Sequence, residues 1–173
     1  MTVSTLFVVL ALFSMKVIAP LQEAHIFNFK NNVLLLYLPH GIRVLTAWLY
    51  GWKSILYILP GQVVVHVMFW GSASLLSTGI FDVIGGASIG YVGVLAALYL
   101  LQGHQTGLLA RPWVLILLAG VIASLANSAI KIMVHDAVPK EVFGYLLGDI
   151  TGLVLLMIIL LYVFKVERQA KLD

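Results

Sequence analysis

The sequence predicts an all-α integral membrane protein, a bundle of about six transmembrane helices, and three observations carry this prediction. Of the 173 residues, 62% are hydrophobic and 10% are charged, whereas soluble domains carry about 25% charged residues. The mean hydropathy is +1.07. The apolar residues fall into runs of about 20, the length at which a helix crosses roughly 30 Å of hydrocarbon. Most of the exterior is therefore expected to face lipid.

Six such runs are predicted to form one transmembrane domain over residues 1–173, because the segments between them are too short to bury a core of their own. Turn signals such as Pro20, Gly51 and Pro112 separate the runs. Residues 1–19 lack the basic start and the cleavage site of a signal peptide, so the first helix is expected to be retained. The predicted spans are 2–19, 32–50, 54–76, 83–101, 113–134 and 142–164.

Six spans place both termini on one side of the membrane, and the basic residues indicate which side. With the C-terminus inside, the inner segments contain Lys53, Arg111, Lys165, Arg168 and Lys171, and the outer segments contain Lys16, Lys30 and Lys140. Loops rich in Lys and Arg stay in the cytoplasm. Both termini are therefore predicted to be cytoplasmic, with the chain in the inner (plasma) membrane of a bacterium.

Several classes of protein are excluded by what the sequence lacks. There is no cysteine, which excludes disulfides, thiolate metal sites and iron–sulfur clusters. No H-E-x-x-H, G-x-S-x-G, P-loop or Rossmann glycine pattern occurs, so neither an enzyme nor a catalytic residue is predicted. The basic residues lie at span ends and form no patch. The expected partner is therefore the lipid bilayer, and no nucleic acid is expected.

Polar residues inside the spans form the candidate site. Ionisable residues are costly in lipid and mark either a binding site or a buried pair. Counted at 1.5 Å per residue, most of them fall at similar depths in the outer half of the bilayer. Pro39 and Gly41 also interrupt helix hydrogen bonding, so freed carbonyls near His40 are expected to line a cavity. The predicted polar layer consists of Pro39, His40, Arg43, Gln62, His66, Asn127, Lys131 and Asp149.

Two interpretations of this polar layer stay open. The first is packing, in which Asp149 forms an ion pair with Lys131 or Arg43; the second is a ligand pocket open to the non-cytoplasmic side. Along 113–134, small and polar residues recur at helical spacing, which indicates a face turned toward other helices. Two histidines at matched depth could ligate a haem. A hydrogen-bonded structural histidine is commoner, so no cofactor and no metal is predicted.

Glycines in two of the spans are predicted to permit close packing of helices. The G-x-x-x-G pattern formed by Gly86 and Gly90 lets helix backbones approach each other. The predicted packing residues are Gly86, Gly90, Gly93, Gly148 and Gly152.

Four short motifs resemble those of a known family. They are Leu36-Tyr37-Leu38-Pro39-His40-Gly41-Ile42, Gly51-Trp52-Lys53, Leu59-Pro60-Gly61 and, in the last span, Gly148-Asp149-Ile150-Thr151-Gly152. With these motifs the chain resembles the membrane-associated sensor domain, first MASE subtype, of bacterial sensor kinases and diguanylate cyclases. The resemblance covers about 32–71 and 143–162. Family members have more spans, and an output domain follows their last helix, where only Lys165–Asp173 follows here.

The resemblance implies a non-enzymatic sensor-like or interaction module that acts through another membrane or cytoplasmic signalling protein. A small-molecule ligand is expected in the polar layer. Two alternatives stay open. One is an accessory or assembly subunit of a larger membrane complex, which the lack of a soluble domain favours. The other is the substrate-binding component of a small-molecule transporter, since energy-coupling-factor importers use six-helix proteins of similar size.

Overall fold

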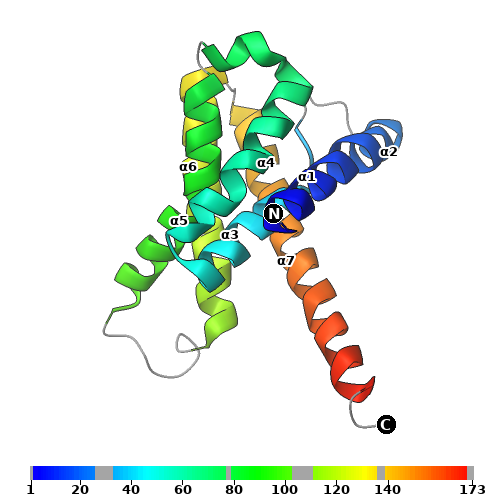
Figure 1. Cartoon of the computed structure of the whole chain (residues 1–173), viewed down its shortest axis with the longest axis vertical. Helices are drawn as coiled ribbons and strands as arrows, with labels where there is room; N and C mark the ends of the chain where they lie inside the picture. The colour runs from blue at the N-terminus through cyan, green and yellow to red at the C-terminus, as the bar shows by residue number, and fades with distance from the viewer. Residues whose placement is uncertain (1, 26–32, 77–78, 103–110, 136–138, 171–173) are drawn as a thin grey trace.

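The computed structural model describes residues 2–25, 33–76, 79–102, 111–135 and 139–170, which form helices and no β-strand (Figure 1). In chain order the elements are α1 (Thr2–Phe13), a π-helical turn (Ser14–Ile18), α2 (Ala19–His25), α3 (Leu38–Tyr50), α4 (Lys53–Trp70), a 3-10 turn (Ser72–Leu76), α5 (Gly79–Leu100), α6 (Pro112–His135) and α7 (Pro139–Ala170).

Five helical segments in the described part of the chain are long and apolar enough to cross a membrane. They are Thr2–Ala24, Lys53–Trp70, Gly79–Leu100, Pro112–Met133 and Pro139–Ala170. Large apolar side chains such as Leu56, Leu95 and Leu161 are exposed on their outer faces. Figure 1 shows α5 and α6 side by side, and the last part of α7 extending away from the other helices. The predicted fold class, an all-α helical bundle, is confirmed, and the five segments fit a multi-pass membrane protein.

The first span is longer than predicted, because Pro20 does not end it. The helix continues from α1 through the π-helical turn into α2 and ends at His25. The backbone N–H of Ala19 bonds to the carbonyl of Ser14, five residues back. This wider turn shifts the hydrogen-bond register, and a proline, which has no N–H to donate, is accommodated there.

The second predicted span, 32–50, is helical only in its second part. Among its described residues, 33–37 are not helical, and α3 begins at Leu38. Pro39 lies in the first turn of α3. Backbone N–H groups in the first turn have no partner within the helix, so the lack of an N–H in proline costs nothing there, and its fixed φ favours helix initiation. The prediction that Pro39 and Gly41 interrupt a longer helix is therefore wrong: Pro39 starts a short one.

The non-helical residues 33–37, called the extended stretch below, bend at Leu35 and lengthen this segment. Five fully extended residues at about 3.3 Å and thirteen helical residues at about 1.5 Å would reach at most roughly 36 Å. The hydrocarbon region is about 30 Å thick. A helix too short to span by itself is thus compatible with a sixth crossing.

Helix α7 pairs with the backbone of the extended stretch. Tyr37 donates its N–H to the carbonyl of Gly148 over 2.9 Å, and the hydroxyl of Thr151 donates to the carbonyl of Leu35 over 2.5 Å. Unpaired backbone groups are costly inside a membrane, so irregular segments occur there only where other protein groups satisfy them. The Gly-Asp-x-x-Gly motif of α7 supplies these hydrogen-bond partners.

Gln22 of α2 also pairs with the backbone of the extended stretch. Its amide nitrogen donates to the carbonyl of Val33 over 2.9 Å, and its amide oxygen accepts the N–H of Leu35 over 2.7 Å. One buried side chain therefore replaces the two partners that a neighbouring β-strand would offer. The extended stretch is held between α2 and α7.

The five predicted packing glycines lie at close backbone or side-chain approaches. A Cβ at Gly148 or Gly152 would collide with a carbonyl oxygen of the extended stretch. A Cβ at Gly90 or Gly93 would collide with the backbone of α3 or α6, respectively. At Gly86 the nearest atoms are the amide of Gln62, 2.7 Å from the added Cβ.

The boundary between the third and fourth predicted spans lies earlier than predicted. Helix α4 ends at Trp70 rather than at residue 76, because Gly71 adopts a φ of +81° and donates its N–H to Val67. Glycine is the residue most readily accepted in this conformation after a helix. Helix α5 then begins at Gly79 instead of residue 83, so Asp82 lies in its first turn.

Candidate functional site

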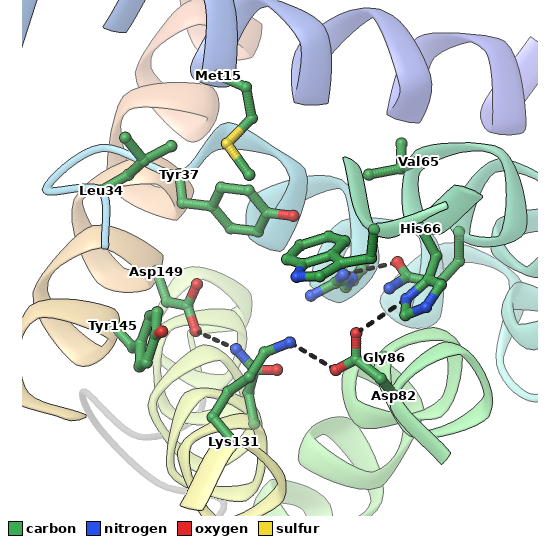
Figure 2. A pocket seen from close by; sticks show the side chains of 14 residues that line it. Met15, Leu34, Tyr37, Val65, His66, Asp82, Gly86, Lys131, Tyr145 and Asp149 are labelled. Carbon is green, nitrogen blue, oxygen red and sulfur yellow. Dashed lines mark hydrogen bonds and ion pairs between the residues drawn. The ribbon is translucent and has the colours of Figure 1, made fainter. Parts of the chain in front are cut away.

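A cavity of about 240 Å³ lies inside the bundle, near the end at which α4 and α6 finish and α5 and α7 begin (Figure 2). Its volume corresponds to that of roughly eight water molecules. Its polar wall consists of Tyr37, Arg43, Gln62, His66, Asp82, Asn127, Lys131, Tyr145 and Asp149. The rest of the wall consists of Met15, Leu34, Val65, Trp70 and Gly86.

The structure brings most of the predicted polar layer to this cavity. Arg43, Gln62, His66, Asn127, Lys131 and Asp149 line it. His40 is completely buried and contacts Asp149 from behind the wall. Pro39 is buried but does not line the cavity. Six of the eight predicted residues therefore line one cavity.

The carboxylate of Asp149 is held by neutral donors and a histidine. Its Oδ2 accepts hydrogen bonds from the Ser124 hydroxyl over 2.9 Å and from the Asn127 amide over 3.2 Å. The Nδ1 atom of His40 lies 3.4 Å from the same oxygen. The predicted ion pair between Asp149 and Lys131 or Arg43 is therefore wrong, because α6 presents Ser124 and Asn127 to Asp149.

His40 lies between Gly120 and Asp149. Its Nε2 atom lies 3.1 Å from the carbonyl oxygen of Gly120, which can only accept, so Nε2 carries a hydrogen. Nδ1 lies 3.4 Å from Asp149 Oδ2 but makes no hydrogen bond. His40 therefore borders the Asp149 carboxylate, whose hydrogen bonds come from Ser124 and Asn127.

Asp82 is the acidic partner of Lys131. Lys131 Nζ lies 2.5 Å from Asp82 Oδ1, and His66 Nδ1 lies 3.4 Å from Asp82 Oδ2. Sequence reasoning missed Asp82, because it was placed in a turn. A signal was present: Asp82, Gly86, Gly90 and Gly93 share one helical face. The glycines of that face pack inward, so a helix beginning before residue 82 would carry Asp82 inward too.

His66 is fixed by a chain of hydrogen bonds beneath Trp70. The hydroxyl of Ser74 donates to the carbonyl of Gly71 over 2.7 Å and lies 2.9 Å from His66 Nε2. The ring of Trp70 stacks on His66 with centroids 5.4 Å apart, and Lys131 Nζ lies 5.7 Å from the Trp70 centroid. Trp70 thus covers both the histidine and the cation, a role that its position at the end of α4 did not reveal.

Arg43 is buried among neutral groups. The residue is only 4% exposed. Nη2 donates to the amide oxygen of Gln62 over 2.7 Å, and the guanidinium carbon lies 5.2 Å from the ring of Phe7 and 5.8 Å from that of Tyr37. In the described part of the chain, Nε has no hydrogen-bond partner and no carboxylate lies within ion-pair distance of this guanidinium.

The geometry of the two histidines bears on cofactor binding. In each ring Nε2 lies within hydrogen-bond distance of a protein oxygen, and Nδ1 lies 3.4 Å from a carboxylate oxygen without making a hydrogen bond. Over the ranges that the structure describes, no group of three or more histidine and acidic side chains could hold a metal ion.

The structure is thus a helical bundle with five segments long and apolar enough to cross a membrane, and a polar, charged cavity lies inside it. Comparisons with models of protein families, with curated proteins and with solved structures gave no match.

Proposed function

We propose that the chain is a membrane receptor that binds a small molecule in the cavity and passes the bound state to a partner protein. The observation that carries this proposal is the cavity itself. Side chains from α3, α4, α5, α6 and α7 converge on about 240 Å³ of space that they do not fill. Buried charges that served packing alone would be expected to close on one another, since unfilled polar space in lipid is unfavourable.

Helix α7 offers a route from the cavity to a partner. Its 32 residues extend about 48 Å, well beyond the roughly 30 Å of hydrocarbon. Tyr145 and Asp149 line the cavity, and Ala170 lies about 30 Å further along the same helix. A rigid helix that carries ligand contacts at one end can move its other end, where 161–170 are exposed. The proposed orientation has both termini in the cytoplasm of a bacterium, which places that end inside.

The motif resemblance agrees with this proposal. Gly148-Asp149-Ile150-Thr151-Gly152 resembles the closing-helix motif of membrane-associated sensor domains, and in this chain it both holds the extended stretch and carries a cavity residue. A ligand that pushed on the cavity wall would therefore act on the helix that leaves the bundle.

A second candidate function is the substrate-binding component of a transporter. The extended stretch favours it, because Leu34 and Tyr37 line the cavity from a non-helical segment. Interrupted helices beside a substrate site are typical of secondary transporters. Uptake into proteoliposomes of the molecule that binds would support transport over reception.

Filling the cavity tests the proposal. Val65 is buried and lines the cavity, whereas its neighbour Val64 is 45% exposed on the outer face of α4. Purification in mild detergent and native mass spectrometry should detect a small molecule on the wild type and on Val64→Trp. Val65→Trp should remain folded by circular dichroism and lack that molecule. Equal occupancy of both variants, or no bound molecule on the wild type, would contradict a receptor role for this cavity.

A further inference from the structure

The charged groups around the cavity are unevenly paired. Lys131 and Asp82 form an ion pair, and Asp149 takes its hydrogen bonds from Ser124 and Asn127. Among the described residues that line the cavity, Arg43 is left as the cation without an opposite charge beside it.

The partners of Arg43 are suited to hold the guanidinium in place without neutralising it. Gln62 accepts one hydrogen bond through a neutral amide, and two aromatic rings lie beside the charge. A buried cation that lacks a counter-charge is strongly destabilising. The arrangement is stable with an anion in the cavity, and a guanidinium binds the planar carboxylate group with particular geometric fit.

We propose that the cavity binds a small organic monocarboxylate, with its anionic group paired to Arg43. This inference rests on the proposed function and names its ligand class. The guanidinium of Arg43, whose Nε is buried without a hydrogen-bond partner, matches one carboxylate group, whereas a phosphate dianion would bring a second negative charge close to Asp82 and Asp149. The apolar wall formed by Leu34, Val65 and neighbouring residues favours a carboxylate with an apolar body.

Three planar molecules of nearly the same shape test the charge of the ligand. Benzoate is anionic, benzamide neutral and benzamidinium cationic. Isothermal titration into the purified full chain in detergent should detect binding of benzoate. Benzamide and benzamidinium should bind more weakly, by about tenfold or more, because they cannot form the charge-assisted hydrogen bond with Arg43. Inorganic phosphate and chloride are titrated in the same way. Binding of either at least as tight as benzoate would overturn the assignment to a carboxylate.

Two variants of Gln62 test the role of Arg43 without removing it. Gln62→Glu keeps the shape and places a carboxylate where the amide oxygen already accepts from Nη2. It should retain or raise the melting temperature and weaken benzoate binding by about tenfold or more, because Arg43 is then neutralised within the protein. Gln62→Met leaves Arg43 uncompensated, so benzoate should still bind, within about threefold of the wild type.

The outcomes separate this inference from the proposed function. If benzamidinium or benzamide binds best and Val65→Trp abolishes that binding, the cavity is a receptor site and the carboxylate assignment is wrong. If benzoate binds equally to Gln62→Glu and the wild type, Arg43 does not hold the anion. If none of the probes binds while a co-purifying molecule occupies the cavity, the ligand class is wrong and the receptor proposal stands.

Discussion

Tyr37 donates its backbone N–H to the carbonyl of Gly148 over 2.9 Å, and this bond joins the extended stretch to α7 beside the cavity. Both sides of the contact also supply cavity wall, through Tyr37 itself and through Asp149, the neighbour of Gly148. The separation of two walls is thus set by a backbone contact that only glycine permits. Stability and the shape of the cavity are expected to depend on the same few residues.

Gly148→Ala should therefore destabilise the protein. Its Cβ would meet the carbonyl of Leu34 in the extended stretch, and neither backbone can yield without moving α7. Overpacking of this kind costs about 1–3 kcal/mol, which a thermal shift in detergent can measure. Gly85→Ala is the matched control, because its Cβ meets only the side chain of Ile130. Equal melting temperatures for the two variants would show that the contact is looser than described.

Gln22→Leu should destabilise the extended stretch specifically. The change leaves the carbonyl of Val33 and the N–H of Leu35 without the partners they have in the structure, at about 1–3 kcal/mol for each buried group. Hydrogen exchange of the Leu35 amide should become faster than in the wild type. Glu23→Leu, a change at the exposed neighbouring residue, should leave that exchange rate unchanged.

The sequence was sufficient for the fold class and for six of the residues that line the cavity, and insufficient for Asp82 and for the pairings. Apolar run lengths report how far each helix extends, so depth could be counted. Rotation of one helix against another is not encoded in a single span. Asp149 was therefore expected to meet Lys131, whereas α6 turns Ser124 and Asn127 toward it and Lys131 reaches Asp82.

The extended stretch was missed for a related reason. The residues Val33, Leu34, Leu35 and Leu36 are apolar and continue the hydrophobic run, so composition alone favours a helix through them. What keeps them extended is distant in sequence: the amide of Gln22 and the backbone of α7. Pro39 could have been read as a helix start, since proline is well placed in a first turn.

Asp149→Asn should lower the melting temperature, and a change at His40 should recover part of the loss. Breaking a buried pair costs about 3–5 kcal/mol in soluble proteins, and less where water defects relieve the charge. A double-mutant cycle with His40→Gln should give a coupling energy of about 0.5–3 kcal/mol. The same cycle with Lys131→Met should give almost none. Strong coupling to Lys131 would contradict the pairing seen in the structure.

Lys131 and Asp82 should form an independent coupled pair. Lys131→Met leaves the carboxylate of Asp82, which is only 4% exposed, without its cation. Asp82→Asn in the same chain should restore part of the lost stability, because the uncompensated charge is removed. Thermal melts of the two single variants and the double variant measure the recovery. Additive losses would show that the two residues do not stabilise each other.

The last prediction concerns the path of the chain through the membrane. If the extended stretch and α3 together cross the bilayer, a reporter fused after Trp52 and one fused near Asn28 must lie on opposite sides. Their combined reach of at most roughly 36 Å is compatible with this crossing. The distribution of basic residues then predicts that fusions after Trp52, near Gln105 and after the last residue read as cytoplasmic.

Fusions near Asn28 and Pro139 should read as external in the same experiment. If the reporters near Asn28 and after Trp52 fall on one side, α3 enters the membrane and returns, and the chain crosses five times. The termini would then lie on opposite sides, and α1 and α4 would cross the membrane in opposite directions. Ser4 and Phe7 lie close to Gly61 in the middle of α4, and Ser14 reaches Leu38 at the start of α3. In the six-crossing path the chain reverses at Gly51, between α3 and α4, and α1 and α4 cross in the same direction; this is the path that we expect the reporters to show.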